Sequence, residues 1–291
     1  MSQRNTVKWA ELFRREFLER LAQQPVVYLP MGLCEPHGHI AVLGLDTLKA
    51  EYLCEEAARR WGGIVAPTQG YQIHEVGFHA PWLAEVAGNV NTCMTSMPTA
   101  PMLYFFLYQL RAFHNAGFRQ AVVISGHSGG NQQDFRRAAE AFMRESDMTV
   151  HVFSDPELTG GQYAGDHAGK YEISQLLYLR PDCIDLDRIH EWQINQPETR
   201  FAQGEDAAEA TAEFGREIIE TCLSGMERIL KTNTFSEKGP ATRSLLPYAT
   251  VEKIWQELKA QSGQWLTSGI KPEQQPTPDT SIWKEYETYR I

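Results

Sequence analysis

The sequence predicts an α/β fold in which a mostly parallel central sheet is covered by helices on both faces. Short apolar runs alternate with longer segments that have the period of an amphipathic helix. Two of these runs, Val26–Met31 and Ala121–Ser125, are almost wholly apolar, as strands buried on both faces are. A polar, glycine-containing loop follows each run. Ligands of parallel sheets bind beyond the carboxyl ends of the strands, so we expect the functional site where these loops meet.

The first helices are predicted from an apolar stripe and from a capping residue. The stripe predicts an amphipathic helix over residues 7–23 and is formed by Trp9, Leu12, Phe13, Phe17 and Leu21. After the strand Val26–Met31, Asp46 is the expected N-cap of a helix that runs to Trp61. The two glycines that follow Trp61 stop this helix.

The later elements follow from the same patterns. They are a strand at 64–67, a helix over 95–118 ended by Gly117, the strand 121–125, a helix over 132–144, a strand at 148–153, a helix over 171–179 and a long helix over 205–231. Residues 69–91 have no clear period and predict a long loop. We expect residues 1–232 to form the main domain. Residues 233–291, rich in Pro, Gln, Ser and Thr, are expected to pack as a tail on the body or on a neighbouring subunit.

Composition limits the classes of protein that the chain fits. With 291 residues, 42% hydrophobic and 22% charged, it has the composition of a globular protein. The formal charge of −10 and the lack of a long basic run argue against a nucleic-acid partner. The longest apolar run, Met102–Leu110, is about half of what a bilayer needs, so we expect no membrane segment. No secretory signal is evident at the start, and five scattered cysteines fit a reducing, cytoplasmic compartment.

Five acidic and imidazole residues are the strongest functional signal. They follow predicted strands or open predicted helices and are Glu35, His37, Asp46, His127 and Glu172. Carboxylates mixed with imidazoles suit a divalent metal, and several carboxylates suit two metals that share one bridging carboxylate. If these residues converge, the chain is a metal-dependent hydrolase.

The segment GHSGG at 126–130 offers a competing interpretation. It matches the G-x-S-x-G nucleophile elbow and lies between a strand and a helix, as a serine hydrolase requires. Ser128 would attack the substrate, with His167 or a later histidine as base. Against this, no HGGG-like oxyanion segment lies upstream, and the EPHGH segment would be left without a role.

Three blocks of the chain together resemble the creatininase (creatinine amidohydrolase) family. They are Glu35-Pro36-His37-Gly38 with Asp46, Gly126-His127 to Gly130-Asn131, and Asp166-His167-Ala168-Gly169 to Glu172-Ile173-Ser174. The resemblance spans about residues 25–181. It implies a three-layer α/β/α sandwich, two divalent metal ions per chain (Zn, Mn or Fe) and a homo-oligomer, commonly a hexamer.

The resemblance also implies roles for these residues. Glu35 and His127 would bind one metal, His37 would bind the other, and Asp46 would bridge them. Glu172 would be the remaining carboxylate ligand, with Asp166 as the alternative for that role. His167, with Asp166 beside it, would protonate the leaving group after a metal-bridging hydroxide attacks a carbonyl. Apart from the resemblance, the candidate substrate contacts are Ser128, Tyr163, His79 and Trp82. Three histidines, His74, His79 and His114, are alternatives as extra metal ligands, but a structural role is expected for each.

Two departures from the family pattern put creatinine itself in doubt. Creatininases carry a ligand glutamate two residues after the histidine of the second block, where this chain has Gly129. The usual second histidine of the first block falls on Ile40, with His39 one position earlier. We therefore expect hydrolytic opening of a small cyclic polar substrate, by C–N cleavage of a cyclic amide. The alternative is C–C cleavage of a cyclic diketo-polyol of the dehydro-inosose type.

Overall fold

The computed structural model describes residues 6–232 and 244–289 and confirms the predicted fold class. Four parallel strands form the central sheet in the order β2-β1-β5-β6. Their bounds are Ile64–Val65 for β2, Val26–Met31 for β1, Gln120–Ser125 for β5 and Thr149–Ser154 for β6. Every residue of β1 and β5 is buried, which explains why their sequences are apolar runs and not alternating patterns.

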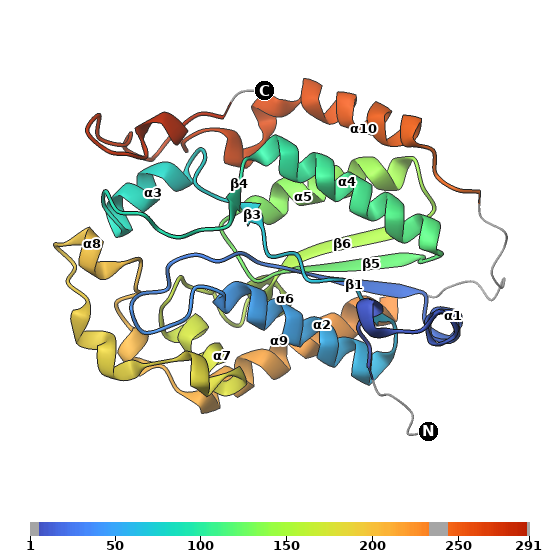
Figure 1. The fold of residues 1–291 in the computed structure, drawn as a ribbon, viewed down its shortest axis with the longest axis horizontal. Coiled ribbons are helices and arrows are strands. Elements are labelled where there is room, and N and C mark those ends of the chain that lie inside the picture. The colour runs from blue at the N-terminus through green and yellow to red at the C-terminus, as the bar shows by residue number, and fades with distance from the viewer. Residues whose placement is uncertain (1–5, 233–243, 290–291) are drawn as a thin grey trace.

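Helices cover both faces of the sheet, so the molecule has three layers (Figure 1). On one face lie α4 (Thr99–Ala116), α5 (Asn131–Arg144) and α10 (Tyr248–Ala260). On the other face lie α2 (Leu45–Trp61), α7 (Lys170–Leu179) and α9 (Ala212–Thr232). A separate hydrophobic core fills each of the two interfaces between sheet and helices.

The remaining elements are short. They are α1 (Arg14–Gln23), α3 (His79–Val86), α6 (Asp155–Leu158), α8 (Pro197–Arg200) and a pair of two-residue parallel strands, β3 (Gln72–Ile73) and β4 (Ser96–Met97), together with several 3₁₀ turns. None of the helices within the described residues is both long enough and apolar enough to cross a membrane.

The N-terminal helix is shorter than predicted. A 3₁₀ turn at Trp9–Glu11 precedes α1, and the apolar stripe does not bury all of its members. Trp9 and Phe17 pack against the core, whereas Phe13 is 65% exposed. The long helix α9 also starts later than predicted, at Ala212. The hydroxyl oxygen of Thr211 accepts a hydrogen bond from the backbone N–H of Phe214 at 3.2 Å and so caps the first turn.

The predicted long loop over 69–91 contains two elements. The strand β3 pairs with β4, and α3 follows it. Because β4 occupies residues 96–97, α4 begins only at Thr99, four residues later than predicted. It ends as predicted, with Gly117 in the left-handed conformation at φ +103°.

The C-terminal segment, residues 244–289, lies along the body of its own chain. Helix α10 packs on α4 and α5, and the residues after it run across to α3 (Figure 1). The buried carboxylate of Asp134 in α5 accepts hydrogen bonds from the backbone N–H groups of Leu266 and Thr267, both at 2.9 Å. Trp283 is 5% exposed and packs with Ala80 and Leu83 of α3.

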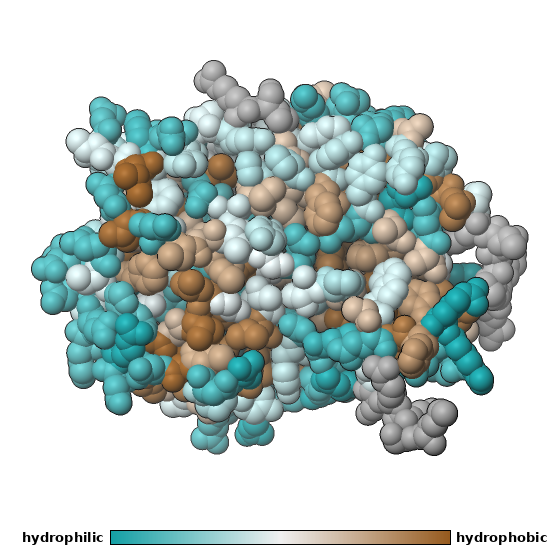
Figure 2. All heavy atoms as spheres, in the orientation of Figure 1, coloured by the Kyte–Doolittle hydropathy of each residue, from teal (hydrophilic) through white to brown (hydrophobic). Residues whose placement is uncertain are grey.

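The molecular surface in the orientation of Figure 1 is mixed in character. Hydrophilic residues predominate around the rim (Figure 2). Hydrophobic residues gather mainly over the left half of that view, in the region of α3, α8 and the chain that follows β1.

Candidate metal centre

Two glycines bring the loops after β1 and β5 against the start of α2. A Cβ atom on Gly126 would lie 2.0 Å from the carbonyl oxygen of Asp46, and one on Gly32 would lie 2.5 Å from the backbone nitrogen of Thr47. Only glycine permits such close approach. Asp46 itself lies in the first turn of α2, whose N-cap is Gly44, so the prediction that Asp46 caps the helix was wrong. The first turn still favours its ionised carboxylate.

Glu35, Asp46 and His127 form one buried group whose ligand atoms all lie within 4.8 Å of one another. Nδ1 of His127 lies 2.7 Å from Oε1 of Glu35 and 3.7 Å from Oδ2 of Asp46. A third imidazole approaches the same carboxylate, since Nε2 of His74 lies 3.0 Å from Oε2 of Glu35.

His37, Asp46 and Glu172 form a second buried group by the same criterion. Nε2 of His37 lies 3.4 Å from Oδ1 of Asp46 and 3.5 Å from Oε2 of Glu172. Nδ1 of His37 lies 3.1 Å from the backbone carbonyl of Glu35, and a hydrogen bond there fixes the tautomer that leaves Nε2 facing the carboxylates. Asp46 therefore turns one oxygen toward each group.

This arrangement fits the two divalent cations that the sequence suggests. The carboxylates of Glu35, Asp46, Glu172 and Asp155 are all buried, and the only ammonium paired with them in the described residues is that of Lys49. The oxygens of Glu35 face only the imidazoles of His127 and His74. Both oxygens of Asp46 and Nε2 of His37 make no well-formed hydrogen bond within the described part of the chain. Buried anions need compensating positive charge, and a cation coordinated by these ligand atoms would supply it.

The pKa values in the cluster reflect the same shortage of positive charge. Burial would raise the pKa of the Glu35 carboxyl, but the neighbouring imidazoles, led by that of His127, hold it well below its ordinary value. Burial and the Glu35 carboxylate raise the pKa of Asp46 to about 8. Burial would lower the pKa of His37, yet Asp46 and Glu172 raise it well above its ordinary value. The ionised form of each buried carboxyl group is thus stabilised only where a positive charge lies near it.

His167 lies beside the two groups and is neutral at pH 7. Burial lowers its pKa to about 4. Its Nε2 lies 2.9 Å from the carbonyl oxygen of Pro36, its ring stacks on that of His37 with centroids 4.7 Å apart, and Trp82 meets it edge-on. One donor atom of His167 also lies within 4.8 Å of ligand atoms of Glu35 and His37.

Asp166 is not paired with His167 as the sequence suggested. Its carboxylate accepts hydrogen bonds from three backbone N–H groups at the start of α7, the shortest being that of Tyr171 at 2.7 Å. The side chain therefore holds the first turn of α7 and with it Glu172. Asp166 still lines the pocket, but its carboxylate is committed to the backbone.

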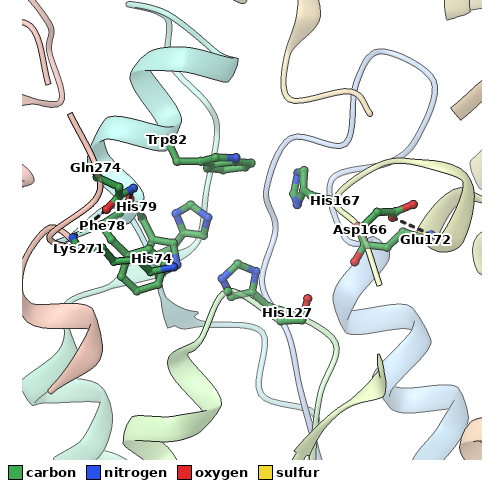
Figure 3. Close-up of a pocket in the computed structure, with 12 residues that line it drawn as sticks. His74, Phe78, His79, Trp82, His127, Asp166, His167, Glu172, Lys271 and Gln274 are labelled. Carbon is green, nitrogen blue, oxygen red and sulfur yellow. Dashed lines mark hydrogen bonds between the residues drawn. The ribbon is translucent and has the colours of Figure 1, made fainter. Parts of the chain in front are cut away.

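A cavity of about 260 Å³ opens onto these groups (Figure 3). Of the candidate substrate contacts, Ser128, His79 and Trp82 line it, together with His127, His167 and Glu172. Tyr163 does not, so that prediction was wrong. Its ring packs against Phe214 of α9 with centroids 5.4 Å apart.

Several residues of the site were not predicted from the sequence. His74 was expected to be structural, and Lys49, Phe78, Lys271 and Gln274 were not singled out. All of these except Lys49 line the cavity. Lys49 follows Asp46 by three residues in α2, so the two side chains lie on one face of the helix. His114 lies away from the site, with Nε2 3.1 Å from a carboxylate oxygen of Asp147.

Ser128 lacks the surroundings of a catalytic serine. Its backbone does not have a positive φ, unlike that of several other non-glycine residues of the described chain. His127, the histidine beside it, directs Nδ1 to Glu35 instead. The elbow-like sequence therefore places His127 beside the Glu35 carboxylate and Gly126 against the backbone of Asp46.

Comparison with known proteins identifies the family. The sequence profile of the creatininase family, described as creatinine amidohydrolase, matches residues 10–230. The chain belongs to this family. Creatinine amidohydrolase of Pseudomonas putida is 27% identical over 252 residues, covering 74% of this chain and 93% of that protein. The chain is accordingly a creatininase-family hydrolase, and its residues 244–289 lie outside the matched range.

Solved structures agree with this assignment. A crystal structure of creatinine amidohydrolase superposes with a TM-score of 0.66 at 23% identity, covering 79% of this chain and 98% of that one. About a fifth of this chain thus has no counterpart there. Two further creatininase structures, named for manganese and for a zinc–zinc form, each give a TM-score of 0.64 at 24% identity. At these identities the likeness concerns the fold.

A second curated relative has a different substrate in its name. The 3-dehydro-scyllo-inosose hydrolase of Thermotoga maritima is 25% identical over 194 residues, covering 62% of this chain. This chain spans 57% of that relative's length.

Proposed function

We propose that this chain is a dinuclear metallohydrolase that opens a small cyclic polar substrate at a carbonyl group. The observation that carries the proposal is the position of Asp46, whose two carboxylate oxygens face two separate ligand groups. One cation would be held by Glu35, Asp46 and His127. The other would be held by His37, Asp46 and Glu172.

The chemistry of the donors limits the metal. Each group mixes imidazole nitrogen with carboxylate oxygen, which suits Zn, Mn or Fe better than Ca or Mg. Bound there, the two cations would supply an activated water and polarise the carbonyl that it attacks. The names of the manganese and zinc–zinc creatininase structures support this choice.

His167 moves the proton in this proposal. Its Nε2 is held by the carbonyl of Pro36, so Nδ1 is the atom that exchanges protons. With its pKa near 4 the ring is neutral, and it accepts a proton from the attacking water before it gives that proton to the leaving atom. Trp82 and the ring of His37 fix the plane of the imidazole and exclude water from two of its sides.

Two kinds of bond cleavage fit this site. The similarity to creatinine amidohydrolase of Pseudomonas putida supports C–N cleavage of a cyclic amide by this chain. The similarity to the inosose hydrolase supports the alternative, C–C cleavage of a cyclic diketo-polyol, in which the leaving carbanion is an enolate. One observation separates this site from creatininase proper: a Cβ atom on Gly129 would lie 2.6 Å from Nε2 of His79, so His79 occupies the room of a larger side chain at that position. That difference favours a substrate other than creatinine.

The test begins with metal-free protein prepared by chelation. It is reloaded separately with Zn, Mn and Fe(II), and each form is assayed on a panel of lactams and of cyclic diketo-polyols. We expect no turnover without metal and recovery in proportion to the metal bound. Activity that survives chelation, together with labelling of Ser128 by a fluorophosphonate, would establish the serine-hydrolase alternative.

We propose a homo-oligomer, a hexamer by family resemblance, that works in the cytoplasm. Light scattering on the metal-loaded protein measures the subunit count directly.

A further inference from the structure

The C-terminal segment, which lies outside the range matched to the family, forms one wall of the cavity. Lys271 and Gln274 belong to this segment and line the cavity with Phe78 and His79. In Figure 3 they lie on the side of His74 and His79, across the cavity from His167, Asp166 and Glu172. A molecule bound between the two walls therefore meets the tail at one end and the proposed metal ligands at the other.

This wall is anchored to the body on both sides of Lys271. Before it, Thr267 donates hydrogen bonds to Asp134 through its backbone N–H and its hydroxyl, at 2.9 and 2.8 Å. After it, the carbonyl of Tyr286 accepts a hydrogen bond from the backbone N–H of Gly77 at 2.8 Å. A Cβ atom on Gly77 would lie 2.4 Å from the carbonyl oxygen of Thr267, which shows how closely the two backbones pack.

The side-chain amide of Gln274 is already hydrogen-bonded to the protein through both its oxygen and its nitrogen. Its side-chain oxygen accepts a hydrogen bond from the backbone N–H of Lys271 at 2.9 Å. Its side-chain nitrogen donates to the carbonyl of Phe78, also at 2.9 Å. The amide thus ties the tail to the segment that opens α3 and fixes where the lysine side chain begins.

The ammonium group of Lys271 is positioned but not neutralised. Nζ lies 4.3 Å from the centroid of the Phe78 ring, in the geometry of a cation–π contact. No carboxylate of the described residues lies within salt-bridge distance of it, whereas Lys253 and Lys284, in the same segment, both have such partners. Lys271 is also the only lysine or arginine among the described residues that line the cavity.

We propose that Lys271 binds an anionic group of the substrate and so selects a small cyclic carboxylate over its neutral counterpart. This inference rests on the proposed function and names the substrate class for the same site. A lysine supplies up to three donors and a full charge, and the aromatic face of Phe78 uses none of its N–H groups in a directed bond. The carboxylate end of the substrate meets Lys271, and the ring carbonyl faces the end of the cavity that His127 and Glu172 line.

The test compares matched pairs of ring compounds on the metal-loaded protein. The pairs are 5-oxoproline with 2-pyrrolidone, and dihydroorotate with dihydrouracil, and each dissociation constant is measured by calorimetry. We expect the anionic member to bind at least about tenfold more tightly, a difference of about 1.4 kcal/mol. Lys271→Met should abolish the preference, and Lys271→Arg should retain most of it. Lys259→Met, which removes the same charge from an exposed position on α10, should leave it unchanged.

Two results would overturn the inference. One is equal affinity for the members of both pairs in the wild-type protein, including no measurable binding of either. The other is an undiminished anionic preference in Lys271→Met, because the metals or the histidines would then hold the carboxylate. Binding is read independently of turnover. A charge preference without hydrolysis contradicts the proposed reaction alone, and hydrolysis without a charge preference contradicts the role of Lys271 alone.

Discussion

Nζ of Lys49 lies 2.5 Å from Oε1 of Glu172, and both side chains are buried. The same ammonium lies 3.3 Å from Asp155 and 3.9 Å from Asp46. Burial would lower the pKa of Lys49, but these carboxylates raise it well above its ordinary value, so the group is charged. The charged lysine therefore stabilises the ionised carboxylates of two proposed metal ligands, Asp46 and Glu172.

Replacing Lys49 by methionine should destabilise the protein strongly. The change keeps most of the side-chain volume but leaves three buried carboxylates without their cation. Removing one partner of a buried ion pair costs about 3–5 kcal/mol. Urea unfolding of the metal-free protein measures this free energy. The matched control is Lys253→Met, whose surface pair with Glu145 is expected to contribute no more than about 1 kcal/mol. Equal losses in the two variants would contradict the account.

Gly126→Ala should disturb both stability and metal binding. The new Cβ atom would meet the backbone carbonyl of Asp46, which cannot rotate away as a flexible side chain does. Overpacking costs about 1–3 kcal/mol, and we expect a loss at the upper end of that range. Displacing Asp46 from His127 should also weaken metal retention. Gly70→Ala, where nothing lies within 4 Å of the new atom, is the control and should remain near wild type. A stable Gly126→Ala protein with full metal content would refute the close approach.

His167→Gln should lower kcat while leaving metal content unchanged. Glutamine keeps a donor for the carbonyl of Pro36 but has no group that titrates. General acid–base catalysis contributes about 10²–10⁴-fold, so kcat should fall by that factor on any substrate the enzyme opens. His114→Gln, which changes a buried histidine far from the cavity, should keep kcat. If the His167 variant instead lost a metal equivalent, His167 would be a ligand.

The strands could be predicted well because burial on both faces leaves a direct mark in the sequence. The bounds of β1 agree with the predicted run, and β5 begins one residue earlier than predicted. The sequence of helix α3 has no comparable pattern. It has eight residues, carries Pro81 in its first turn, and is stabilised by contacts with Trp283, far away in the sequence. Contacts of this kind depend on tertiary structure and leave no periodic pattern.

The residues of the site also fall into those that the sequence predicts and those that depend on tertiary structure. Glu35, His37, Asp46, His127 and Glu172 could be found because each follows a strand or opens a helix. Lys49 could not be found, because a lysine within a helix usually lies in solvent. Lys271 could not be found either, because it lines the cavity only as a result of how the C-terminal segment folds back over the body. Tyr163 was misplaced because an aromatic beside a glycine-rich loop can pack inward as well as face a substrate, and here it packs on Phe214.

The most direct measurement is elemental analysis of the purified wild-type protein and of Asp46→Asn, with Asp187→Asn, an exposed site, as the control. The account predicts about two equivalents of Zn, Mn or Fe in the wild type and in the control. It predicts close to none in Asp46→Asn, with an unchanged circular dichroism spectrum and no activity. Two retained equivalents and near-normal turnover in Asp46→Asn would contradict the shared carboxylate on which the dinuclear site depends.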